Sequence, residues 1–265
     1  MIPFYPYFPG IVPLDYLHGN KVANQLLISY EDHFSNIFFV TSSACQKNNN
    51  ETMPLSPVTA ITDTYTYLAL GDSYTIGESV PAAENFPNQT VTILNNSSLN
   101  FQPARIIAKT GWTTDELEAG IIAAYATDPL LSSYDFVSLL IGVNNQYRSR
   151  SIGNYKTEFD ELVKKAIHFA AGITDRVIIL SIPDWSVTPF AVGSDRQQIA
   201  EQIDEYNAAN KQVADKYKVH YINITPGTRE AAFDPELLAA DGLHPSGKAY
   251  KKWAEEVAAF IKSRL

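Results

Sequence analysis

The sequence predicts a single α/β domain in which helices cover both faces of a five-stranded parallel sheet. From Tyr65 onward, short runs rich in Ile, Val and Leu alternate with longer amphipathic segments. Strands that are buried on both faces have this continuous apolar character, and their alternation with helices is typical of a doubly wound sheet. The polar residues of greatest chemical interest follow strand ends, where ligands bind in such sheets. We therefore expect one three-layer domain.

Length and composition fit this expectation. The chain has 265 residues, of which 45% are hydrophobic and 18% are charged, which is enough for one sizeable core. Residues 1–60 lack a sustained hydrophobic period, which indicates a leader and flexible linker. Residues 61–265 are therefore expected to form the domain. The formal net charge of -9 would repel phosphate backbones, and nucleic acid is not an expected partner.

Cys45 is the only cysteine of the chain, and it follows the apolar run Ile37–Val40 and the small residues 41–44. This order is like the end of a bacterial lipoprotein signal, in which the cysteine is lipidated and Gln46–Asn50 would serve as a tether. The apolar run is short for a signal, and no basic segment stands nearby. Two interpretations stay open: a lipoprotein tethered to the membrane in the bacterial cell envelope, or a cytoplasmic protein with an ordinary Cys45 in its leader.

Five strands are predicted from short runs of Ile, Val, Leu and aromatic residues that are bounded by polar or glycine-containing segments. In chain order they are Tyr65–Leu70, Ala104–Ala108, Phe136–Ile141, Arg176–Ile182 and Val219–Ile224.

Five helices are predicted between and after the strands, and a helical turn is expected to open at Ser73. Thr113 and Glu116 have the spacing of a capping box, which marks the start of the second helix. Gly172 is a plausible helix stop. In chain order the predicted helices are Asn85–Asn95, Thr114–Tyr125, Tyr155–Ala171, Gln197–Tyr217 and Lys248–Leu265.

Three residues have the side chains of a catalytic triad: Ser73 after the first strand, and Asp241 and His244 near the C-terminus. A serine hydroxyl is a poor nucleophile at neutral pH, so it needs an imidazole to take its proton and a carboxylate to hold that imidazole. The string Gly71–Thr75 does not fit the Gly-x-Ser-x-Gly elbow of α/β-hydrolases. We therefore predict a different kind of serine hydrolase, in which Asp and His share one short loop.

Four blocks in the same order resemble the SGNH (GDSL-type) hydrolase family: Gly71-Asp72-Ser73, Gly111, Gly142-Val143-Asn144-Asn145 and Asp241-Gly242-Leu243-His244-Pro245. The resemblance covers residues 63–265. It implies Ser73 as nucleophile, His244 as general base and then acid, and Asp241 as the residue that orients the histidine. The third block often ends in aspartate in this family, so Asn145 departs from the pattern and bears on the supporting contacts of the site.

The resemblance also implies an oxyanion hole made of the backbone N–H groups of Ser73 and Gly111 and the side-chain amide of Asn144. Physical chemistry agrees with these residue types. A tetrahedral intermediate concentrates negative charge on one oxygen, and each preorganised donor lowers the barrier by about 3 kcal/mol. A glycine at position 111 lets a backbone amide approach the reacting carbonyl closely.

Further residues next to these blocks are expected to contact the substrate: Asp72, Trp112, Asn145 and Tyr147. Trp185 and Phe190 fit either an aromatic wall of the site or ordinary loop packing. Arg148 and Arg150 hint at an anionic head group, although solvation alone would also explain them.

The five histidines lack the spacing of metal ligands, so neither a metal nor a cofactor is expected. We predict a metal-independent esterase that forms an acyl-enzyme and takes a small-molecule ester, with lysophospholipids, short-chain acyl esters and acylated sugars as candidates. Two alternatives remain: an acyltransferase with the same triad, and a non-catalytic flavodoxin-like module that binds phosphate. The sequence does not indicate an oligomeric state.

Overall fold

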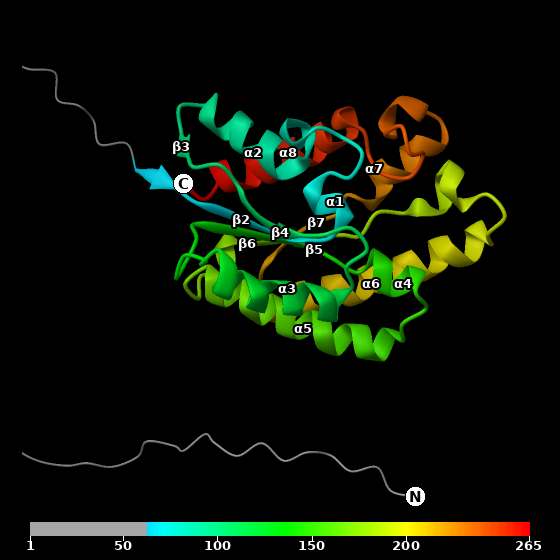
Figure 1. The fold of residues 1–265 in the computed structure, drawn as a ribbon, viewed down its shortest axis with the longest axis horizontal. Coiled ribbons are helices and arrows are strands. Elements are labelled where there is room, and N and C mark those ends of the chain that lie inside the picture. The colour runs from blue at the N-terminus through cyan, green and yellow to red at the C-terminus, as the bar shows by residue number, and fades with distance from the viewer. Residues whose placement is uncertain (1–62) are drawn as a thin grey trace, which may run out of the picture. The chain divides into compact units, whose positions relative to one another are not determined.

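The predicted five-stranded parallel sheet is confirmed in the computed structural model, which describes residues 63–265 (Figure 1). The strand order is β4-β2-β5-β6-β7, and all neighbouring strands run parallel. Each strand lies inside its predicted range or extends it by one residue. The bounds are β2 (Tyr67–Gly71), β4 (Arg105–Ala108), β5 (Phe136–Leu140), β6 (Val177–Leu180) and β7 (His220–Ile222).

Helices cover both faces of this sheet. Figure 1 shows α2 and α8 together over one face, and α3, α5 and α6 over the other. The long helices are α2 (Phe86–Asn95), α3 (Thr114–Thr127), α5 (Ile152–Phe169), α6 (Arg196–Tyr217) and α8 (Gly247–Lys262). Three short helices follow strand ends: α1 (Ser73–Ile76), α4 (Val143–Tyr147) and α7 (Thr225–Arg229). None of the helices that the structure describes is both long and apolar enough to cross a membrane.

The sequence did not predict the smallest elements. Strand β1 (Thr64–Tyr65) pairs in parallel with β3 (Asn100–Phe101) in a separate two-stranded ladder. Short 3-10 helices occupy loops of the described region: η1 (Ala82–Glu84), η2 (Thr174–Arg176), η3 (Trp185–Val187), η4 (Pro189–Ala191), η5 (Glu230–Ala232) and η6 (Pro235–Leu237). The expectations for Cys45 and the leader lie outside the described residues.

The helix termini show which local signals decide the boundaries. Helix α3 begins as predicted, because the Glu116 carboxylate accepts a hydrogen bond from the Thr113 backbone N–H at 2.9 Å. Helix α5 begins at Ile152, earlier than predicted, because Ser151 caps it. It ends at Phe169, and Gly172, in the left-handed conformation at φ +81°, closes the end through its N–H to the Ile167 carbonyl at 2.9 Å.

The centre of the sheet fixes where the functional residues lie. All five residues of β2 and of β5 are buried. Gly71, the last residue of β2, stands opposite Ala108 of β4 and Leu140 of β5. The segments that follow these three adjacent strands therefore leave the sheet side by side at one edge, which is the edge where doubly wound sheets bind ligands.

Candidate active site

The turn from β2 into α1 presents Ser73 at the first position of the helix. Asp72 is the N-cap residue, and its Oδ1 accepts a hydrogen bond from the Tyr74 backbone N–H at 3.0 Å. Gly77 ends the helix after one turn in the left-handed conformation at φ +78°. Ser73 is only 4% exposed, so the turn buries most of this residue.

Gly71 makes this tight turn sterically possible. A Cβ atom at this position would lie 2.1 Å from Thr75 Oγ1 and 2.4 Å from the Leu140 carbonyl oxygen. Both distances are far below van der Waals contact, and Leu140 contributes backbone that cannot rotate away. The Gly-Asp-Ser string therefore reflects two physical needs, a residue without a side chain and a helix cap.

The loop before α8 fixes His244 through Asp241. The Asp241 Oδ2 atom lies 2.6 Å from His244 Nδ1, and Oδ1 accepts hydrogen bonds from the backbone N–H groups of Leu243 and His244, both at 3.0 Å. Gly242 takes the left-handed conformation at φ +68°, and the Ala239 N–H closes the loop onto the His244 carbonyl at 2.8 Å. Both oxygens of one carboxylate thus set the backbone and the ring of the histidine.

Asp241 is held in its ionised form. Partial burial by itself would raise the pKa of this carboxyl, but hydrogen bonds from His244, Leu243 and Ser79 outweigh burial and lower the pKa to about 2. Ser79, which lies just after α1, donates its hydroxyl to Asp241 Oδ2 at 2.7 Å. Sequence reasoning missed Ser79, because a serine in a polar loop carries no signal of a partner 162 positions away.

The nucleophile turn and the Asp–His loop are in contact. The ring of Tyr74, the residue after Ser73, packs on the ring of His244 with centroids 4.8 Å apart. Within residues 63–265, neither the Ser73 hydroxyl nor His244 Nε2 takes part in a hydrogen bond. Catalytic hydrogen bonds are often long before a substrate binds and tighten in the complex. The contact of Tyr74 with His244 places the Asp–His loop beside the turn that presents Ser73.

The three expected oxyanion donors also lie at this edge. In the described part of the chain, the backbone N–H groups of Ser73 and Gly111 make no internal hydrogen bond. Gly111 adopts φ +82°, and its carbonyl accepts a hydrogen bond from Arg148 Nη2 at 2.6 Å. Asn144 Nδ2 donates to the Trp112 carbonyl at 3.0 Å and lies 3.4 Å from Asp72 Oδ2.

Asp72 and Asn145, which we expected to contact substrate, are buried and have other partners. Asp72 is 1% exposed, and its burial raises the pKa of its carboxyl to about 7. Asn145 is fully buried: its Oδ1 accepts from the Thr114 N–H at 3.1 Å, and its Nδ2 donates to Thr114 Oγ1 at 2.7 Å. The expectation fails for both because their side chains turn inward, Asp72 toward Asn144 and Asn145 toward the start of α3.

Trp112 also differs from expectation. Its ring packs over α3, where a Cβ atom added to Gly120 would lie 2.0 Å from the indole. Its backbone carbonyl accepts a hydrogen bond from Asn144 Nδ2 at 3.0 Å. Trp112 therefore supports the oxyanion region through its main chain, and its side chain belongs to the packing of α3.

An apolar depression beside Tyr74 and Leu243, here named the outer hollow, comprises about 320 Å³ of empty space, open solvent included. It contains Tyr147, which is 55% exposed. It also contains Trp185 and Phe190, for which the sequence left open either a wall of the site or ordinary loop packing. The Tyr147 ring centroid lies 5.5 Å from that of Trp185 and 6.0 Å from that of Phe190. The lining consists of Tyr74, Val143, Tyr147, Trp185, Phe190 and Leu243.

The two arginines near the site are already paired. Arg148 contacts Glu116 at 3.1 Å besides holding the Gly111 carbonyl, and Arg150 contacts Asp115 at 3.3 Å. The anionic head group suggested by these arginines is therefore not supported. Among the described residues, no group of three or more His, Cys, Asp or Glu side chains is arranged to hold a metal ion.

Comparison with known proteins matches the chain to one family. The model of the GDSL-like Lipase/Acylhydrolase family matches residues 69–252 of the chain. A comparison with curated proteins found no match.

Solved structures share the fold at low sequence identity. The crystal structure of TesA is 19% identical with a TM-score of 0.58, covering 76% of this chain and 99% of that one. Axe2, an acetylxylan esterase from Geobacillus stearothermophilus, is 20% identical with a TM-score of 0.57, covering 74% and 94%. A family 3 carbohydrate esterase from Clostridium thermocellum is 19% identical with a TM-score of 0.56, covering 76% and 96%.

Proposed function

The chain belongs to the GDSL-like lipase/acylhydrolase family and is a carboxylic ester hydrolase, and from this premise we propose that Ser73, His244 and Asp241 are its catalytic residues and that its substrates are esters of short acyl chains. The observation that carries the proposal is the hydrogen-bonded Asp241–His244 pair, packed through Tyr74 against the turn that presents Ser73. Neighbouring strand ends supply the groups that such a reaction needs.

The first half of the reaction forms an acyl-enzyme. Ser73 Oγ attacks the ester carbonyl carbon while its proton passes to His244 Nε2, and the carbonyl oxygen becomes an oxyanion. The N–H groups of Ser73 and Gly111 receive that charge together with the Asn144 amide, which donates the hydrogen that is not bound to the Trp112 carbonyl. When the tetrahedral intermediate collapses, the bond to the alkoxy oxygen breaks and His244 returns the proton to the departing alcohol.

The second half releases the acid by the same groups. A water molecule attacks the acyl carbon, its proton passes to His244 Nε2, and the oxyanion forms again. Collapse of this intermediate breaks the bond to Ser73 Oγ, which takes the proton back from His244. Asp241, ionised because its pKa is about 2, stabilises the imidazolium in both halves and keeps the ring in place.

The outer hollow fits the acyl part of an ester better than a sugar or a charged head group. All six side chains that line it are apolar or aromatic. A hydroxylated alcohol placed there would lose hydrogen bonds to water without replacement, which costs free energy for every unpaired group. An unbranched acyl chain has no such groups, so the hollow favours short-chain acyl esters over substrates that would put a polar moiety there.

Two other functions make different demands on these residues. An acyltransferase would use the same triad but prefer an alcohol to water as acceptor, so adding an alcohol would divert most of the acyl group from hydrolysis. A phosphate-binding module would use the start of α1 only, and it would leave the Asp241–His244 pair without a role.

The experiment that tests the proposal combines covalent labelling with kinetics. A fluorophosphonate probe is expected to label the wild-type protein on Ser73 and to leave Ser73→Ala unlabelled. Ser73→Ala and His244→Ala are each expected to lower kcat on p-nitrophenyl acetate by at least about a thousandfold. His168→Ala serves as a matched control, because this exposed histidine lies on α5, and it should retain wild-type turnover. Labelling at another residue, or turnover by Ser73→Ala near the wild-type rate, would reject the assignment.

A further inference from the structure

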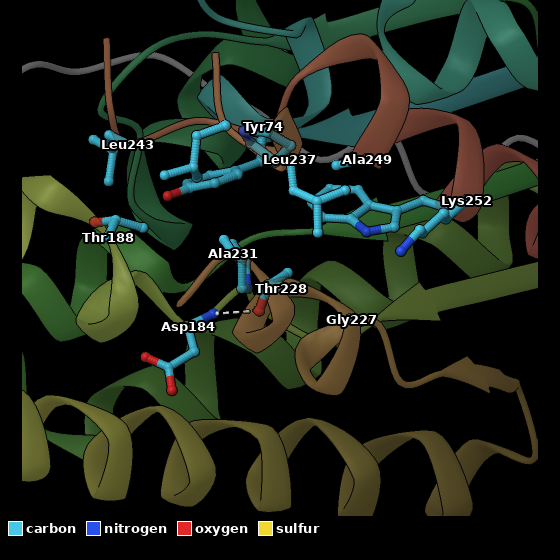
Figure 2. Close-up of a pocket in the computed structure, with 14 residues that line it drawn as sticks. Tyr74, Asp184, Thr188, Gly227, Thr228, Ala231, Leu237, Leu243, Ala249 and Lys252 are labelled. Atoms are coloured by element: carbon cyan, nitrogen blue, oxygen red, sulfur yellow. Dashed lines mark hydrogen bonds between the residues drawn. The ribbon is translucent and has the colours of Figure 1, made fainter. Parts of the chain in front are cut away.

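A second cavity lies directly behind the outer hollow, and the two share a wall. This inner cavity is narrow in the wild-type protein, and the empty space in and in front of it, open solvent included, amounts to about 400 Å³. Tyr74 and Leu243 line both spaces. Figure 2 shows Tyr74, Leu237 and Ala231 around the inner cavity, contributed by α1, η6 and η5.

The two residues of the wall are held in different ways. Tyr74 is nearly fully buried, and its ring packs on the catalytic histidine. Leu243 is half-buried, and only its backbone is fixed, through its N–H to Asp241 Oδ1 at 3.0 Å. The Leu243 side chain can therefore be shortened without removing a hydrogen bond, whereas a change at Tyr74 would disturb His244.

The lining of the inner cavity suits hydrocarbon. Apolar side chains supply most of it, among them Leu237, Leu238, Ala249 and Trp253.

Four of the polar side chains at its edge already have partners. Asp184 accepts from Arg229 Nε at 2.8 Å, the Thr188 hydroxyl donates to the Trp185 carbonyl at 2.7 Å, and Lys252 contacts Glu230 at 2.6 Å. Thr228, the fourth, accepts from the Asp184 N–H at 3.0 Å, which Figure 2 marks. A sugar or charged group would find few free partners among these residues.

We propose that Leu243, braced by Tyr74, ends the acyl-binding space and so sets the length of the acyl chain that the enzyme accepts. In the wild-type protein the acyl chain stops in the outer hollow. When the Leu243 side chain is shortened, the outer hollow and the inner cavity become one apolar space, and a longer unbranched chain extends into it. This inference rests on the esterase function proposed above and adds which acyl chains the site takes.

The test compares chain-length profiles. The kcat/KM values for p-nitrophenyl acetate, butanoate, hexanoate and octanoate are measured for the wild-type protein, Leu243→Val and Leu243→Ala. Wild-type kcat/KM is expected to be highest for acetate or butanoate. In Leu243→Ala the octanoate-to-acetate ratio should rise about tenfold or more, since each further buried methylene contributes roughly fourfold. Leu243→Val should change the ratio in the same direction by less, and it serves if the alanine variant folds poorly.

A double variant shows whether the inner cavity holds the part of a longer acyl chain that extends past residue 243. Ala231 faces the inner cavity from η5, an element separate from the catalytic loop. Leu243→Ala combined with Ala231→Leu refills the space, and its octanoate-to-acetate ratio should fall back toward the wild-type value.

The outcomes separate this inference from the function on which it rests. Hydrolysis of none of the four esters by the wild-type protein would overturn both. Wild-type hydrolysis with the same octanoate-to-acetate ratio in both Leu243 variants would overturn the role of Leu243 alone. An unchanged high ratio in the double variant would overturn the role of the inner cavity.

Discussion

Ser79 holds a backbone conformation that serine avoids. Its φ of +66° lies in the left-handed region, which costs a residue with a side chain about 1 kcal/mol relative to glycine. Its hydroxyl donates to Asp241 Oδ2 at 2.7 Å, the same oxygen that contacts His244 at 2.6 Å. Strain that persists beside a reacting group indicates a functional constraint. Ser79 thus acts as a positioning residue for the Asp–His pair.

Replacing Ser79 should separate activity from stability. Ser79→Ala and Ser79→Gly both remove the donor, and each is expected to lower kcat about tenfold, in line with a lost hydrogen bond to a charged group. KM for p-nitrophenyl acetate should stay unchanged, because Asp241 does not contact the substrate. Ser79→Gly should also raise the melting temperature relative to Ser79→Ala, since glycine relieves the strained φ.

Ser98→Gly is the matched control for this pair. Ser98 has φ +65° in the exposed turn after α2, so its replacement should relieve similar strain and leave kcat at the wild-type value. A Ser79→Gly enzyme with full kcat would show that the hydroxyl has no part in positioning.

The proposed catalytic residues could be picked out in the sequence because each has a required chemistry at a required place in the chain. Ser73, Gly111, Asn144, Asp241 and His244 all lie at one edge of the sheet, as their positions after strand ends indicated. The supporting roles were not predictable. Whether Asp72, Trp112 or Asn145 faces substrate or protein depends on side-chain direction, which strand and helix periodicity do not fix within a turn.

At the scale of elements, the β2–α1 turn is the place where close packing restricts the sequence most. Gly71→Ala would drive a Cβ atom to 2.1 Å from Thr75 Oγ1 and 2.4 Å from the Leu140 carbonyl. Because the second clash is with backbone, we expect a loss of at least about 3 kcal/mol in the free energy of unfolding, together with loss of activity. Urea unfolding followed by circular dichroism measures the change.

Gly153→Ala provides the opposite case. Gly153 lies exposed in the first turn of α5, and a Cβ atom there would meet nothing within 4 Å. Alanine should increase stability by about 0.5 to 1 kcal/mol through its greater helix propensity. If Gly71→Ala proved as harmless as Gly153→Ala, the steric explanation of the turn would be wrong.

Helices and strands with a strong hydrophobic period or a continuous apolar run were predicted, and the shortest elements were missed. The five sheet strands and five long helices had such patterns. The two-residue strands β1 and β3 are too short to show any period. Helix α7 (Thr225–Arg229) has a proline at its second position, which is equally typical of a turn. At α5, the Ser151 cap was present in the sequence and would have placed the start correctly.

For the molecule as a whole, the order of the strands follows from connection rules only in part. Alternating strands and helices with right-handed crossovers require a parallel sheet, but they leave open on which side of β2 each later strand is added. In the observed order β4-β2-β5-β6-β7, β4 is added on one side of β2 and β5 on the other. The direction in which strands are added therefore reverses at β2. Ser73 therefore stands at the switch point of the sheet.

Two carboxyls, the buried Asp72 and the partly buried Asp241, should make the free energy of unfolding depend on pH. Their effects should have opposite signs and should fall in different pH ranges. Asp72 has its pKa raised to about 7, so its contribution is fully present below about pH 4 and is lost as the pH rises through 7. Asp241 has its pKa lowered to about 2, so its contribution is present above about pH 4 and is lost as the pH falls through 2.

Urea unfolding at a series of pH values checks both slopes. Asp72→Asn should flatten the decline in the free energy of unfolding between about pH 4 and 7, and Asp241→Asn should flatten the decline between about pH 4 and 2. Equal pH profiles in the wild-type protein and Asp72→Asn would mean that residue 72 ionises as freely as in water.

The packing of α2 against α8 joins two parts of the described chain that lie far apart in the sequence. These two helices, Phe86–Asn95 and Gly247–Lys262, form the most extensive helix pair of the described region, and the imidazole loop lies just before the second of them. A chain emerging from the ribosome carries Ser73 long before it carries His244. A fragment that stops short of His244 would lack the base that the proposed mechanism requires.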